Sequence, residues 1–227
     1  MATLMNAWKE KAPGGVMLWG YNTYFSNYMT PFDSYDVLDD LLSWAVENDV
    51  YHFWAQGAWD STASTAFESV KTYVLSKLMW DSTLDVNNLI NAYFKGVYGT
   101  GGVAADMRDA FDKMRMHMAN SGKTQGSIYD EPAPKKKYII GITYDDSIWT
   151  MTFLNEQLSR LNAAITTLGV KEGGVYDSIV CESISVRWML KEYRNTSSTS
   201  YDGKAWGTWS NDISRLGFNR VSEGKEF

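Results

Sequence analysis

The sequence predicts an α/β fold over its first 80 residues and a mainly helical continuation. Two apolar runs, residues 14–19 and 50–54, follow turn-forming residues and are predicted to be buried strands. Each is followed by a loop and then by a segment of helical period, over residues 35–48 and 64–80. A strand–helix–strand order with this spacing is typical of a parallel pair joined by a crossover helix. We therefore expect the two strands to lie parallel and adjacent.

Helix signals mark the rest of the chain. Apolar residues recur on one face over residues 35–48, and Asp33 or Ser34 is placed to cap that helix. The segment over residues 64–80 keeps the same period. Further helices are expected over residues 86–97, 103–120, 147–168, 175–194 and 201–216.

A change in composition divides the chain. Residues 121–137 are rich in Gly, Ser, Pro and Lys and are expected to be a linker, and residues 138–142 a short strand or extended segment. This gives one unit over residues 1–120 and a helical domain over residues 138–227. The polar tail after Gly217 is expected to fray.

Composition excludes several classes of function. The net charge is −6 and the basic residues are scattered, so nucleic acid is not an expected partner. No run of 18 apolar residues and no signal peptide is present, so no membrane partner is expected. The single Cys excludes an internal disulfide, and with only two His a zinc site of the usual ligands is not expected. No other metal and no cofactor is expected. The 10 Trp, 14 Tyr and 9 Phe instead favour a binding surface.

Four blocks of sequence resemble a known bacterial family, the domain of unknown function 4838. The blocks are residues 18–32, 50–59, 73–81 and 89–99, and the similarity extends over about residues 16–120. In that family the domain sits in large proteins that resemble glycoside hydrolases such as α-glucuronidases and hexosaminidases. The resemblance implies the C-terminal β/α units of a TIM-like barrel followed by a mainly helical domain. It also implies that the full-length protein acts on an oligo- or polysaccharide, which is compatible with secretion or the periplasm.

The loops that follow the two strands hold the candidate contacts, because chemistry in parallel α/β folds gathers at the carboxyl ends of strands. Aromatic rings there would stack on a sugar and amides would bind its hydroxyls. The candidate carbohydrate-binding residues are Tyr21, Asn22, Tyr24, Trp54, Gln56, Trp59 and Asp60. The alternative is that the rings are core and the polar groups cap loops; for Trp19, which ends an apolar run, core is favoured.

Catalytic residues stay unassigned. Glycoside hydrolysis uses two carboxylates about 5 to 9 Å apart, whereas the loops offer only Asp33 and Asp60, both placed as caps. Ala55 also departs from the family pattern, which often has an acidic residue there. We therefore expect this chain alone to be inactive, with the acid and base on earlier strands of a full-length glycoside hydrolase. The alternative is a non-enzymatic carbohydrate-binding or protein-interaction module. In either case the open strand edges are expected to be covered by residues 138–216, by self-association or by contact with an N-terminal domain.

Other reactive residue types have plainer explanations. His52 is expected to lie in the core or to support the site without acting in catalysis, and His117 to be a surface or packing residue of a helix. Cys181 is expected to be a small buried apolar residue. The Gly-rich stretch over residues 98–102 follows a helix and lacks the Lys of a phosphate loop, so it is expected to be a helix C-cap.

Overall fold

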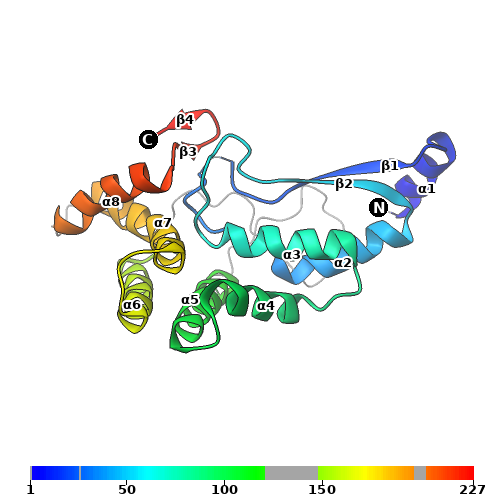
Figure 1. Ribbon diagram of the computed structural model, residues 1–227. Coiled ribbons are helices and arrows are strands. Elements are labelled where there is room, and N and C mark those ends of the chain that lie inside the picture. Colours follow the sequence, from blue (N-terminus) through cyan, green and yellow to red (C-terminus); the bar gives the residue numbers. More distant parts are fainter. Residues whose placement is uncertain (1, 26, 121–147, 197–202) are drawn as a thin grey trace.

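The computed structural model describes residues 2–25, 27–120, 148–196 and 203–227 (Figure 1). The helices are α1 (Ala2–Lys11), α2 (Tyr35–Glu47), α3 (Glu68–Trp80), α4 (Val86–Tyr98), α5 (Gly102–Asn120), α6 (Met151–Leu168), α7 (Gly174–Thr196) and α8 (Gly203–Leu216). The strands are β1 (Val16–Tyr21), β2 (Val50–Gln56), β3 (Arg220–Ser222) and β4 (Lys225–Glu226). The fold is mixed α/β and mostly helical, as predicted. Its described residues form two two-stranded sheets, and these do not make up a barrel.

The predicted parallel pair is confirmed. β1 and β2 are parallel neighbours in a register that sets Trp19 opposite Trp54. The register shifts at Val16/Met17, next to Tyr51. Gly15 lies directly under that ring, since a Cβ at this position would meet Tyr51 Cδ2 at 1.8 Å. A residue with a side chain cannot occupy position 15 without displacing the ring.

The prediction that both strands are buried is wrong. Figure 1 shows α2 and α3 on the same side of β1 and β2, and among the described residues no helix covers the other face of this sheet. β1 accordingly alternates between half-buried and exposed residues. On the open face the exposed fractions are 54% for Met17, 53% for Trp19 and 63% for Tyr21. Because apolar residues stand on both faces of β1, the alternation could not be read from the sequence.

Helices α2 to α7 pack around one hydrophobic core. Its centre is a cluster of rings in which Phe111 lies 5.3 Å from both Phe67 and Phe94. The predicted helices are found within a few residues of their expected bounds, and α1 was not predicted. The helix expected from residue 64 begins only at Glu68, because Ala66 and Phe67 before it are left-handed.

The C-terminal tail does not fray. Phe218 and Val221 are buried in a second cluster with Tyr28 and Met29. The tail also bonds to the loop after β1, where the Tyr28 N–H donates to Val221 O at 2.8 Å. The expectation from the tail's polar composition is therefore wrong, because buried apolar residues and hydrogen bonds to distant loops together anchor the β3–β4 hairpin.

The smaller predictions have mixed outcomes. Gly99, with φ 82°, is the C-cap of α4, so the expectation for residues 98–102 is confirmed. His117 packs as expected, stacking on Phe153 at 3.6 Å between ring centroids. Cys181 is only partly buried. The predicted linker over residues 121–137 and the extended segment at 138–142 lie outside the described residues.

Candidate binding site

Rings on the open face of the β1–β2 sheet form one continuous array, here called the aromatic strip: Trp54, Trp19, Tyr21 and Phe25. Successive ring centroids lie 5.7 Å, 6.5 Å and 5.5 Å apart. Trp54 is 57% exposed, and the alternative that Trp19 and Trp54 are core residues is therefore wrong. Large aromatic side chains that gather on one exposed face make this strip the candidate binding surface.

A hydrogen bond fixes the middle of the aromatic strip. Trp19 Nε1 donates to Gln56 Oε1 at 2.6 Å across the two strands. Gln56 is paired with Tyr21 in the register, so its amide lies beside two rings of the strip. The amide nitrogen of Gln56 has no partner in the described part of the chain and offers two donors to a ligand.

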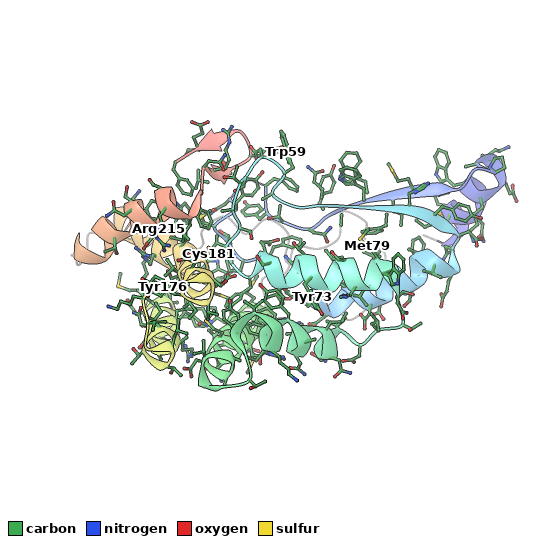
Figure 2. All side chains as sticks on the ribbon, in the orientation of Figure 1. Trp59, Tyr73, Met79, Tyr176, Cys181 and Arg215 are labelled. Carbon is green, nitrogen blue, oxygen red and sulfur yellow. The ribbon has the colours of Figure 1, made fainter. Side chains whose placement is uncertain are left out.

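A groove follows the free edge of β2, the edge that pairs with no other described strand. It consists of two hollows of about 450 and 340 Å³ that share Phe53, Trp54 and Met79. Met79 lies between α3 and β2 in Figure 2. Trp54 thus belongs to the groove as well as to the aromatic strip and joins the two. Each volume lies in the range of natural small-molecule sites.

A buried ion pair closes the groove at the carboxyl end of β2. Lys71 is 2% exposed, and its Nζ donates to Asn22 O at 3.0 Å, to Phe32 O and to Glu68 Oε1 at 3.0 Å. Burial raises the pKa of Glu68, the neighbouring Lys71 lowers it, and the net direction is upward. Asn22, Glu68 and Lys71 all line the groove next to Trp54. The site therefore combines an aromatic face with a fixed charged group.

Backbone strain places Glu68 at this end of the groove. Ala66 and Phe67 have φ values of 56° and 60°, which residues other than glycine seldom adopt. The Phe67 N–H donates to Glu182 Oε2 at 2.6 Å, and the Phe67 carbonyl accepts from Tyr35 Oη at 3.1 Å. Conformations of this kind cost about 1 to 3 kcal/mol each and persist where their surroundings enforce them. Here they start α3 so that its first residue faces the groove.

Only some of the predicted site residues lie together at the aromatic strip. Tyr21, Trp54 and Gln56 lie together, on or beside the aromatic strip. Asn22 lines the groove but is only 7% exposed. Tyr24 is 9% exposed, so it offers no ring face to a ligand.

Trp59 lies instead beside the C-terminal hairpin (Figure 2), and Asp60 bonds to that hairpin through Gly224. Trp59 is 65% exposed, but its Nε1 donates to Glu223 Oε1 at 3.0 Å. Asp60 accepts from Tyr28 Oη at 2.6 Å and from the Gly224 N–H at 2.9 Å. Burial raises the pKa of Asp60, but these hydrogen bonds outweigh burial and hold it below its usual range. The structure gives Asp60 the role of tying the tail to two loops.

The sequence analysis missed Glu68 and Lys71, and it favoured core for Trp19. The charged pair escaped notice because Glu68 was assigned to the interior of a helix rather than to its first residue. Its spacing from Lys71 and Thr72 gave a weak signal, since residues three and four apart on a helix share a face.

The fold and the site thus define an α/β segment with an open, aromatic sheet face, extended by a helical half. Residues 1–112 match the family model described as "Domain of unknown function (DUF4838)". Over these 112 of its 227 residues the chain is similar to that family. Neither the comparison with curated proteins nor that with solved structures finds a match.

No described helix has the length and apolar character needed to cross a membrane. In the same residues, no three His, Cys, Asp or Glu side chains gather closely enough to hold a metal ion.

Proposed function

We propose that this chain binds an extended saccharide, which lies on the aromatic strip and enters the groove beside β2. The observation that carries the proposal is the continuous exposed array of Trp54, Trp19 and Tyr21 on a rigid sheet. Flat rings stack on the C–H faces of pyranoses, while a few placed polar groups set orientation. Gln56 at the strip and Glu68 in the groove are such groups.

The same proposal assigns the chain a binding role rather than a hydrolytic one. Glu68 is the single carboxylate among the described residues that line the groove. Hydrolysis of a glycosidic bond uses a pair. We propose that β1 and β2 are the last β/α units of a TIM-like barrel in a glycoside hydrolase-like protein. The acid and base would then come from strands outside this chain.

A protein-interaction module is the second candidate, because both outer edges of the β1–β2 sheet are unpaired among the described strands. Unpaired edges invite pairing with another strand, from a second copy or from a preceding domain. Light scattering across a range of concentrations tests self-association. A Met17→Lys variant, which adds charge to the open face, would shift a dimer towards monomer.

A glycan array followed by calorimetry tests the proposed function. The wild type should bind one or more oligosaccharides, and Trp54→Ala should weaken binding by about tenfold or more, as loss of a large stacking side chain does. Trp80→Ala is the matched control, since Trp80 is 92% exposed on α3 and does not line the groove. No binding by the wild type, or equal loss in both variants, would refute the proposal.

A further inference from the structure

Helix α3 lines the groove with hydrogen-bond acceptors, and from this we infer which saccharides the groove takes. We infer that it selects neutral and amino sugars over uronic acids, and that the charge of Glu68 sets this preference. The inference rests on the proposed function and names the substrate class of that same site.

The acceptors form one stripe along α3. Glu68, Thr72 and Ser76 follow each other at intervals of four residues, so they share one face of the helix, and all three line the groove. Thr72 Oγ1 donates its hydrogen to Glu68 O at 3.0 Å, and Ser76 Oγ donates to Thr72 O at 2.7 Å. Both hydroxyl hydrogens are therefore used within the helix. What remains for a ligand is lone pairs.

Glu68 is the strongest acceptor of the stripe. Its Oε1 accepts from Lys71 Nζ, whereas its Oε2 has no hydrogen-bond partner in the described part of the chain. The side chain is 12% exposed, which leaves this second oxygen open to the groove. Lys71 spends its three donors on Glu68 and on the carbonyls of Asn22 and Phe32. The ammonium group thus holds the carboxylate in place and has no hydrogen left for a ligand.

This arrangement discriminates by charge and by hydrogen-bond type. A sugar hydroxyl or ammonium donates to Glu68 Oε2 in a charge-assisted bond. A uronate carboxylate carries the same charge as Glu68 and has no hydrogen to donate. Asn22 Nδ2 uses one hydrogen on Gly20 O at 3.1 Å and keeps a second, but a single neutral donor does not cancel the repulsion between two carboxylates. Selection therefore includes a repulsive element as well as an attractive one.

Calorimetry with three hexasaccharides at pH 7.5 tests the inference: a neutral glucose oligomer, a glucosamine oligomer and a galacturonic acid oligomer. The wild type should bind the first two at least tenfold more tightly than the third. Glu68→Gln should weaken the neutral and amino ligands by about tenfold, the value of a charged hydrogen bond. It should also narrow the preference over the uronate ligand to within about threefold.

Two further variants keep the test decisive. Thr72→Val removes an exposed acceptor without changing charge and should cost about threefold on the neutral and amino ligands. Glu172→Gln, at an exposed site outside the groove, should leave all affinities unchanged. The inference is overturned if the wild type binds the uronate oligomer as tightly as the neutral one or more tightly, or if Glu68→Gln keeps the wild-type preference. In either case, binding that depends on Trp54 would still support the proposed function. If no saccharide binds the wild type, both fall together.

Discussion

The buried carboxyl of Glu182 makes the stability of the fold depend on pH. Glu182 is 4% exposed, on α7, and its Oε2 accepts the N–H of the left-handed Phe67. Burial raises the pKa of Glu182 from 4.5 to about 8; the Phe67 hydrogen bond lowers it and the neighbouring Glu68 charge raises it further. At pH 7 the folded protein therefore keeps a proton on Glu182 that the unfolded chain has lost.

The sign and the size of the effect follow from this proton. Between pH 5 and 8 the folded state binds more protons than the unfolded state, so the free energy of unfolding falls as pH rises. The slope from this one group is at most about 1.4 kcal/mol per pH unit, or about 4 kcal/mol over that range. For a chain of this length, each kcal/mol corresponds to about 2 to 4 °C in Tm.

Glu182→Gln removes the proton uptake and keeps an oxygen that accepts the Phe67 N–H. We expect the variant to match the wild type near pH 5 and to be more stable by several kcal/mol at pH 8. Urea unfolding at pH 5, 6, 7 and 8 measures the difference. Glu172→Gln, at an exposed position, is the control and should follow the wild type. If the free energies of unfolding of the wild type and Glu182→Gln differ by the same amount at every pH from 5 to 8, the reasoning is refuted.

Three further changes test the site's supports by urea unfolding. Lys71→Met leaves Glu68 buried without its partner and should lower the free energy of unfolding by about 3 to 5 kcal/mol. Lys77→Met, at an exposed position of the same helix, should lower it by less than about 0.5 kcal/mol. Similar losses in both variants would contradict a stabilising role of the buried pair. Asp60→Ala should lower the free energy of unfolding by about 1 to 3 kcal/mol. Because the pKa of Asp60 is lowered in the folded state, the difference from wild type should shrink as pH falls below about 4. A difference that persists in acid would contradict a stabilising role of the Asp60 carboxylate. Ala66→Gly removes the steric cost of a positive φ at position 66 and should leave the free energy of unfolding unchanged or raise it by about 1 kcal/mol. A clear loss of stability would show that Ala66 is unstrained.

Sequence patterns predicted the elements that depend on local periodicity and spacing. The apolar runs about 35 residues apart gave the parallel pairing of β1 and β2, and the helical period gave most helices. The C-cap at Gly99 followed from residue type alone. These features need no knowledge of what packs against them.

The features that failed depend on tertiary context. Trp19 is exposed because the described helices cover only one face of the sheet, which no pattern within β1 reveals. Glu68 reaches the groove because Ala66 and Phe67 adopt left-handed conformations without a glycine to signal them. The tail is ordered because Asp60, far away in sequence, binds the Gly224 N–H. Contacts between distant segments decided each case.

The central claim is that a saccharide lies on Trp19 and Trp54, and NMR of the indole N–H groups tests it most directly. The chain has 10 Trp, and Trp→Phe variants assign their signals. On titration with an oligosaccharide found on the array, we predict shifts for the Trp19 and Trp54 signals. The bond from Trp19 Nε1 to Gln56 Oε1 makes the first a sensitive reporter. Trp80, exposed on α3, should not shift. Binding that shifts other indole signals and leaves those of Trp19 and Trp54 unchanged would contradict the account.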